Sequence, residues 1–177
     1  MTTTTGDRSA ARPAPQRKVF RLFCLSFHHF DDAMARKVLK STLDTSDAFA
    51  IVELQERRLG SLLLMLLEFG LLFFVTVFWF WGDWLHLVAT YVVPLLPAIH
   101  AFDGFVSCLR TRTFEETMEL VEDVDGRGGG GKGHALVGNG LSVRRAGWVF
   151  RYERSLHTWP MGYMSIISGR KIEAVVG

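Results

Sequence analysis

The chain has 177 residues, of which 49% are hydrophobic, and it carries a formal net charge of +2. This length suits one domain with a modest core, and the near-neutral charge gives no indication of nucleic acid as a partner. Cys24 and Cys108 lie far apart in apolar segments. The pattern therefore indicates neither a disulfide framework nor a zinc site, and a reducing compartment is expected.

The first segments in chain order are a polar tail and a strand–helix–strand unit. Residues 1–16 are rich in Thr, Ala and Pro and lack the apolar core of a signal peptide, so we predict a disordered tail. Residues 17–57 contain two apolar runs, at 19–27 and 48–54. Runs of this kind are typical of parallel strands that are buried on both faces, with a helix as the crossover between them.

The motif HHFDD follows the first predicted strand and holds the candidate catalytic residues, His28 and His29. Asp31 and Asp32 suit the N-cap and first turn of the following helix. The motif also lies at the carboxyl end of a predicted parallel strand, where open α/β sheets bind ligands. Structural and ligand-binding roles both remain open. No metal site is predicted, because neighbouring histidines in an extended chain point to opposite sides.

Residues 58–109 contain two long apolar runs, at 59–81 and 84–102. Each run has about the length that a helix needs to cross a bilayer, roughly 20 residues. Basic residues flank the pair at its outer ends and are absent from the connecting turn: Arg57, Arg58, Arg110 and Arg112. We therefore predict a transmembrane helical hairpin with both chain termini in the cytosol.

Other arrangements of this hairpin remain open. The two helices could be re-entrant, lie on the membrane surface, cover a sheet in a soluble protein, or form an interface between copies. Four ionisable side chains in the hairpin are costly in lipid, and two prolines interrupt a helix. These residues are Glu68, His86, His100, Asp103, Pro94 and Pro97.

The remaining segments complete the predicted domain. Residues 110–125 have the pattern of an amphipathic helix, in which Thr113 and Glu116 have capping-box spacing. Residues 126–140 read as a flexible Gly-rich loop. They match G-x-x-x-x-G-K without the following Ser or Thr of a phosphate-binding loop. Residues 141–177 are predicted to form the last strands, which pair antiparallel.

Three blocks of the chain, taken in order, resemble a group of fungal class I S-adenosylmethionine-dependent methyltransferase-like proteins. The blocks are "RLFCLSFHHFDDAMARKVLKSTLDTSDAFAIVELQERR", "YVVPLLPAIHAFDGFVSCLRTRTFEETMELV" and "HTWPMGYMSIISG". The similarity covers roughly residues 17–125 and 145–177. It implies an α/β fold in which 19–27 is the fourth strand, 48–54 is the fifth, and the last two strands close a partial Rossmann-like sheet.

The resemblance also implies a cofactor, S-adenosylmethionine, and a set of site residues. His28 and His29 would act as base or as hydrogen-bonding groups for the methyl acceptor, with Asp31 and Asp32 at the edge of the donor and substrate pocket. His157 and Trp159 lie in another matching block, together with Tyr163, and are candidates for the same edge.

The matching region corresponds to the C-terminal half of the family's sheet. In the family, a Gly-rich loop after the first strand and an acidic residue after the second strand hold the donor, and residues 1–18 offer neither. We therefore expect a truncated or degenerate chain that does not bind the donor alone. The function hypothesis is a membrane-associated, methyltransferase-like protein with an unknown acceptor. The alternative is a non-catalytic membrane hairpin protein that binds a partner or a second copy of itself.

Overall fold

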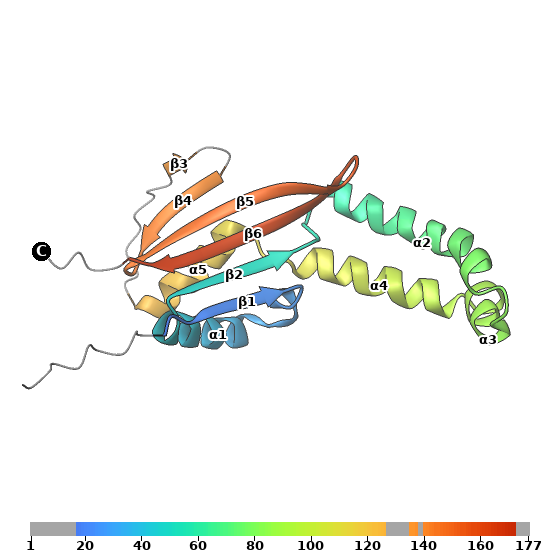
Figure 1. Ribbon diagram of the computed structural model, residues 1–177, viewed down its shortest axis with the longest axis horizontal. Helices are drawn as coiled ribbons and strands as arrows, with labels where there is room; N and C mark the ends of the chain where they lie inside the picture. Colours follow the sequence, from blue (N-terminus) through green and yellow to red (C-terminus); the bar gives the residue numbers. More distant parts are fainter. Residues whose placement is uncertain (1–16, 127–134, 138–139, 173–177) are drawn as a thin grey trace, which may run out of the picture.

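The computed structural model describes residues 17–126, 135–137 and 140–172. Its six strands are β1 Phe20–Cys24, β2 Ala48–Glu53, β3 Ala135–Val137, β4 Gly140–Arg145, β5 Trp148–Thr158 and β6 Gly162–Lys171. Its α-helices are α1 Asp32–Thr45, α2 Leu59–Trp79, α3 Trp84–Leu87, α4 Leu95–Arg110 and α5 Phe114–Asp125. The strands form one mixed sheet in the order β1-β2-β6-β5-β4-β3 (Figure 1). The predicted α/β class is confirmed at this level.

The unit β1–α1–β2 has the predicted parallel pairing, with Phe20 opposite Ala48. The predicted N-cap is also confirmed, because the Asp31 carboxylate accepts a hydrogen bond from the Met34 N–H at 2.7 Å. The first strand is shorter than predicted, since Leu25 adopts a positive φ of 50° and turns the chain out of the sheet. A short 3₁₀ turn, Phe27–His29, follows.

The sheet buries only one of its faces. Helices α1 and α5 lie side by side on that face and enclose a core that includes Leu39, Phe49, Phe150 and Trp148, each at most 2% exposed. The prediction that both strands are buried on two faces is wrong, because alternate residues are exposed in β1 and only half-buried in β2. Strand β1 is the edge of the sheet, and Phe20 is 61% exposed.

The two apolar runs form a hairpin that projects away from the sheet (Figure 1). Helix α2 is long and apolar enough to cross a membrane, and only 11% of its most apolar stretch is buried. The second run is broken into α3, a π-helical turn at Val88–Val92, and α4, with a bend of 65° at the break. Pro94, the N-cap of α4, accounts for the break, because proline cannot continue the preceding helix.

Helices α2 and α4 pack against each other through a small residue. A Cβ atom at Gly104 would overlap the Met65 side chain, so glycine permits the close approach of the two helices. The Tyr91 hydroxyl donates a hydrogen bond to the Phe73 carbonyl, and His100 Nε2 lies 3.1 Å from Glu68 Oε1. These polar contacts satisfy costly groups within the hairpin.

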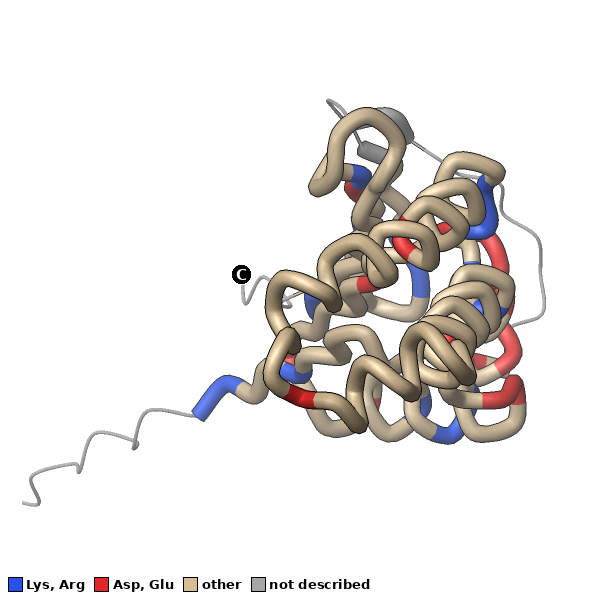
Figure 2. Tube along the Cα trace, turned by 90° about the vertical axis from the view of Figure 1, so that its right-hand side faces the viewer, with Lys and Arg blue, Asp and Glu red and all other residues tan. Residues whose placement is uncertain are grey.

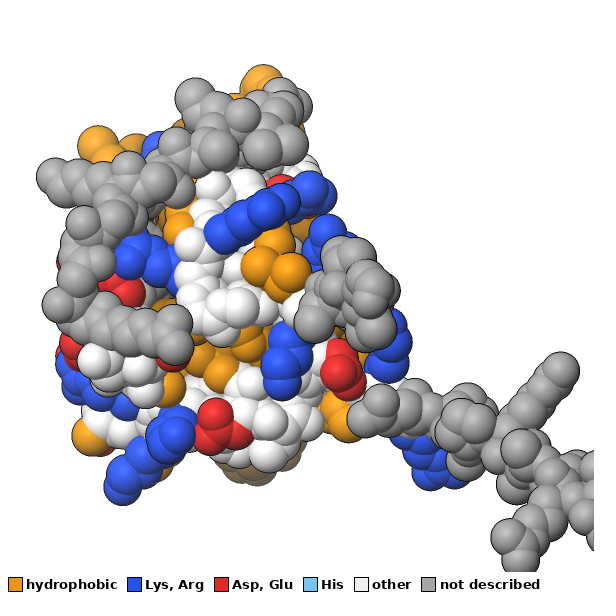
Figure 3. All heavy atoms as spheres, turned by 90° about the vertical axis from the view of Figure 1, so that its left-hand side faces the viewer, with side chains coloured by type: hydrophobic (Ala, Val, Ile, Leu, Met, Phe, Trp, Pro, Cys, Tyr) orange, Lys and Arg blue, Asp and Glu red, His pale blue; other side chains and the backbone are white. Residues whose placement is uncertain are grey.

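The molecule has two chemically different ends. Viewed from the hairpin end, the helices nearest the viewer are largely free of charged residues (Figure 2). The opposite end presents Lys, Arg, Asp and Glu side chains on its surface (Figure 3). Four basic residues line a pocket where β1, β4 and β6 begin or end: Lys18, Arg144, Arg170 and Lys171.

The C-terminal half largely follows the predictions. Helix α5 carries the predicted capping box between Thr113 and Glu116. Strands β5 and β6 pair antiparallel, as expected, although they are longer than predicted. The prediction of a flexible loop over 126–140 is wrong at 135–137, which form β3, while 127–134 and 138–139 lie outside the described residues. The predicted tail, 1–16, lies outside them as well.

Candidate functional site

A buried histidine–glutamate pair joins the carboxyl ends of the two parallel strands. In β2, the residues that point into the core are Phe49, Ile51 and Glu53, so the alternation places a carboxylate at the last core position. His28 stands in the 3₁₀ turn that follows β1. His28 and Glu53 are 5% and 4% exposed. The pair therefore occupies the edge of the sheet where ligands bind in open α/β folds.

Hydrogen bonds fix the orientation of the imidazole. Glu53 Oε1 accepts from the backbone N–H groups of Phe27 and His28 at 3.0 and 3.2 Å, and Oε2 lies 2.8 Å from His28 Nδ1. An ionised carboxylate only accepts, so Nδ1 donates its proton to Glu53, and in a neutral ring Nε2 is then an acceptor. Ser107 Oγ lies within hydrogen-bond distance of Nε2, at 3.2 Å.

This chain of groups has the order serine–histidine–carboxylate, which can activate a serine nucleophile. Ser107 is only 5% exposed and is not among the residues that line the cavity beside His28. The arrangement therefore suits a fixed histidine whose Nε2 can exchange Ser107 for a ligand. It suits a serine nucleophile less well. Because Ser107 lies on α4, the contact also ties the hairpin to the sheet.

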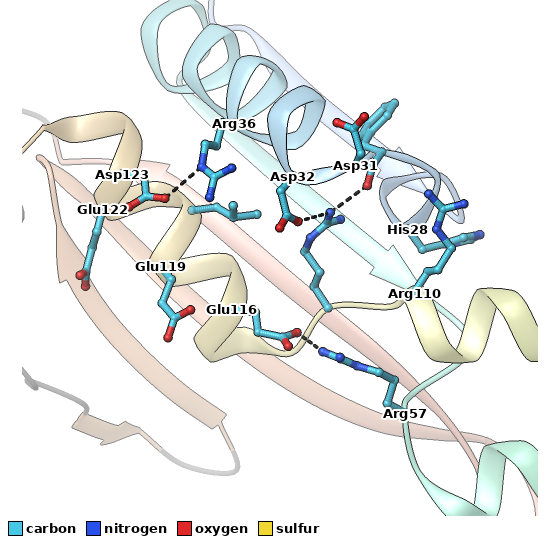
Figure 4. A pocket seen from close by; sticks show the side chains of 13 residues that line it. His28, Asp31, Asp32, Arg36, Arg57, Arg110, Glu116, Glu119, Glu122 and Asp123 are labelled. Atoms are coloured by element: carbon cyan, nitrogen blue, oxygen red, sulfur yellow. Dashed lines mark hydrogen bonds and ion pairs between the residues drawn. The ribbon is translucent and has the colours of Figure 1, made fainter.

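His28 lines a cavity of about 760 Å³ between α1, α5 and the two ends of the hairpin (Figure 4). We call it the charged cavity, after its lining. The other residues that line it are Phe30, Asp31, Asp32, Arg36, Arg57, Arg110, Arg112, Glu116, Glu119, Leu120, Glu122 and Asp123. Its acidic and basic side chains come from both helices and from both hairpin ends.

Ion pairs occupy many of these charges. Arg36 binds Asp123 at 2.9 Å, and Arg57 binds Glu116. Arg112 binds Asp32 at 2.8 Å and donates to the backbone carbonyls of Phe27 and Phe30. The hydrogen bond and charge of Arg112 hold the pKa of Asp32 below its usual value. Asp31 and Asp32 thus have structural partners, as one of the two open interpretations expected.

Of the remaining charged residues, Glu122 pairs with Arg145 and Asp31 caps α1, which leaves Arg110 and Glu119. Within the described part of the chain, neither Arg110 nor Glu119 makes an ion pair, and both are exposed. They are the groups that a ligand in the charged cavity meets without first breaking a contact. A ligand with one anionic and one cationic or hydrogen-donating group fits this arrangement.

The other predicted site residues do not converge on the charged cavity. His29 is exposed beside His28, with ring centroids 4.2 Å apart; the two histidines stand in a turn, so the extended-chain argument against a metal site was wrong in its premise. His157 lies at the far end of β5, and Trp159 is 83% exposed in the β5–β6 turn. Neither lines the charged cavity.

Sequence reasoning missed two members of the site. Glu53 could have been found, because a glutamate two residues after Ile51 falls on the core face of a predicted buried strand. Ser107 offers no such signal, since it is one of several polar residues on α4 and lies 79 positions from His28.

A second cavity, of about 670 Å³, lies between α2 and the β5–β6 turn. We call it the apolar cavity. Its apolar lining consists of Leu54, Leu64, Met65, Leu67 and Leu71. Its polar groups are Gln55, Ser61, Glu68, His157 and Thr158. His157 Nε2 lies 3.1 Å from the Leu54 carbonyl oxygen, and Nδ1 lies 2.8 Å from Thr158 Oγ1.

The described residues contain no cluster of side chains suited to a metal ion. No group of three or more His, Cys, Asp or Glu side chains in ranges 17–126, 135–137 and 140–172 could hold a metal. Only β1 and β2 are parallel neighbours in the sheet, and β1 leads into the 3₁₀ turn and α1 without a glycine in the connection.

Comparison with known proteins adds no relative from which a function can be transferred. No protein-family model, no curated protein and no solved structure matches this chain.

Proposed function

We propose that this chain is the acceptor-side part of a membrane-associated, methyltransferase-like protein, and that further strands added at β1 complete its donor site. Two adjacent parallel strands joined by one helix, followed by two late strands that extend the sheet, agree with the arrangement that the resemblance implies for the fourth, fifth and last strands. In this arrangement the donor is bound by the added strands.

The observation that carries the proposal is the open edge of β1. This strand is the outer strand of the sheet, and it exposes Phe20, Leu22 and Cys24 along one face. Phe20 and Leu22 are 61% and 58% exposed. An apolar edge strand is a template for pairing with another strand, and soluble domains normally protect such an edge. A neighbouring parallel strand would also extend the ligand-binding edge beside His28.

The hairpin supports membrane association. Outward-facing side chains of α2 are large and apolar, as in Phe74 at 71% and Phe78 at 70% exposure. Trp79, Trp81 and Trp84 gather at the turn and are each more than 70% exposed. Tryptophan favours the interface between lipid and water, and Arg57, Arg58 and Arg110 stand at the opposite end. This polarity agrees with a hairpin whose basic ends face the cytosol.

His28 is the residue best placed to act on an acceptor. Glu53 holds its Nδ1–H, so Nε2 is a fixed acceptor that could take a proton from an acceptor hydroxyl or amine in the charged cavity. In methyl transfer the larger contribution comes from aligning acceptor and donor methyl, which a buried and oriented ring favours.

The test compares two exposed apolar residues on the same α/β unit. Methyl transfer from radiolabelled S-adenosylmethionine is measured in membranes of source-organism cells that carry the wild-type chain, Leu22→Asp or Met34→Asp. Met34, on α1, is 50% exposed and does not belong to the edge strand. We expect Leu22→Asp to lose the transfer that depends on the chain, while Met34→Asp keeps it.

The alternative, a non-catalytic hairpin protein, predicts a different outcome. It is favoured by the structural partners of Asp31, Asp32 and His28, which account for these residues without chemistry. Under the alternative, cells that lack the chain have the same methylated products as wild-type cells. In wild-type cells the chain remains in the membrane fraction after carbonate extraction. Calorimetry should show no binding of S-adenosylmethionine by the isolated chain, and binding in the micromolar range would contradict the proposed division of the site.

A further inference from the structure

We propose that the apolar cavity binds a long-chain amphiphile, with its alkyl chain along α2 and its polar head at His157 and Thr158. This inference rests on the proposed membrane association, and it names a ligand class for a site distinct from the charged cavity. The cavity has the size of a small-molecule site, because such sites span about 300–1,000 Å³.

Most polar groups of the cavity lie at one end and most apolar groups lie along its length. His157, Thr158 and Gln55 come from the end of the sheet, whereas Leu67 and Leu71 come from farther along α2. Glu68 also lines this farther part, where His100 lies 3.1 Å from its carboxylate. The lining on α2 runs from Ser61 to Leu71, which corresponds to about 15 Å of helix. A molecule that is polar at one end and apolar over the rest of its length matches this order.

The cavity opens toward the outer surface of the hairpin. Leu67 and Leu71 line the cavity and are nevertheless 61% and 57% exposed. The apolar wall is therefore continuous with the outer surface of the hairpin. In a membrane this surface meets lipid chains, so an alkyl chain can enter the cavity sideways without crossing water.

The inner wall of the cavity has a fixed shape. A Cβ atom at Gly162 would stand 2.9 Å from Leu64 Cδ1 and 2.7 Å from Thr158 Cβ, so glycine at this position holds the β5–β6 turn close to α2. His157 is also hydrogen-bonded to Thr158 through Nδ1 and to the Leu54 carbonyl through Nε2. The head-group end is thus pre-formed, while the chain end is open.

The experiment uses the full chain in phosphatidylcholine vesicles and two photoactivatable probes. One probe is a fatty acid with a diazirine close to its carboxyl group, so that the reactive carbon lies at the head-group end of the cavity; it is added from solution. The other is a phosphatidylcholine with the same diazirine in one acyl chain, built into the vesicles. After illumination, labelled peptides are mapped by mass spectrometry. We expect labelling of the α2 segment 61–71 together with the β5–β6 turn, which the hairpin surface alone would not give.

Two variants of adjacent leucines provide the control. Leu67→Trp fills the cavity from a residue that lines it, whereas Leu66→Trp places the same side chain at a 56% exposed position outside the lining. We expect Leu67→Trp to lose the labelling of the turn and Leu66→Trp to retain it. Labelling by the fatty acid alone assigns the site to a free amphiphile, and labelling by both probes assigns it to a bilayer lipid chain as well.

The outcomes separate this inference from the proposed function. If the chain floats with the vesicles but the turn is unlabelled, or is labelled equally in Leu67→Trp, the amphiphile site is wrong and the membrane association stands. If the chain does not float with vesicles of any composition, both are wrong.

Discussion

The sheet with its two covering helices and the projecting hairpin are both rich in large apolar residues, but only the first region buries them within the chain. Leu39 and Phe150 in the core are fully buried, whereas Phe74 and Trp79 in α2 are 71% and 77% exposed. Burial within a folded chain stabilises that chain, while exposed apolar surface of this extent marks contact with a partner or a membrane. An apolar sequence therefore predicts that a segment is buried. It does not predict whether the rest of the chain, a partner or a membrane buries it.

The largest expected effect separates the two regions directly. Phe150→Ala should lower the free energy of unfolding by about 3–5 kcal/mol, because it leaves a cavity in a closed core. Phe74→Ala should change it by less than about 0.5 kcal/mol, because the side chain packs against little of the chain. Guanidinium unfolding in micelles, followed by circular dichroism, measures both. A similar loss in the two variants would mean that α2 is part of the core.

A second comparison uses the histidine–glutamate pair of each region. Glu53→Gln should cost about 1–3 kcal/mol, because it weakens a buried partner of His28 and of two backbone N–H groups. Glu68→Gln should cost less, because Glu68 has one partner, His100, to which a glutamine amide can still hydrogen-bond, whereas Glu53 has three. Equal costs in the same unfolding measurement would contradict the assignment of the sheet pair as the more strongly constrained one.

The smallest effect concerns the joint between the regions, where Arg57 before α2 binds Glu116 on α5. Burial raises the pKa of Glu116, but Arg57 and the Thr113 N–H outweigh it, so the pKa lies below the ordinary value of 4.5. The carboxylate therefore contributes stability above pH 4.5, and this contribution is lost as the pH falls through the folded-state pKa. Glu116→Gln should flatten that part of the profile of melting temperature against pH.

Two further variants check this assignment. Glu119→Gln, on the same helix and without an ion pair in the described part of the chain, should keep the wild-type profile. Thr113→Ala removes the other half of the capping box and should cost about 1 kcal/mol at neutral pH. An unchanged acid limb in Glu116→Gln would show that other carboxylates dominate it.

Local chemistry explains which elements were predictable from the sequence. Helix α5 has a capping box and an apolar stripe in which Phe114, Met118 and Val121 are all buried, and both features act within a few residues. The cap of α1 at Asp31 is local in the same way. The apolar runs of α2 and α4 are long enough to make helices the expected outcome.

The position of a strand in the sheet is not a local property of its sequence. The predictions fail where this position decides whether a strand is buried. The apolar run at 19–27 is compatible with a central or an edge strand, and only the pairing places β1 at the edge with Phe20 and Leu22 exposed. The candidate site likewise has one residue that local sequence predicts and one contact that it does not. His28 was predictable from its place after a strand, whereas its contact with Ser107 depends on how the hairpin returns to the sheet.

The hairpin meets the sheet at two separate points, and the consequence is geometric. Helix α2 is pressed onto the β5–β6 turn at Gly162, and α4 is bonded to the turn after β1 through Ser107 and His28. Two attachments resist rotation in a way that one flexible hinge does not. A hairpin seated in a bilayer would consequently act as a rigid stem, setting both the height and the tilt of the histidine above the lipid.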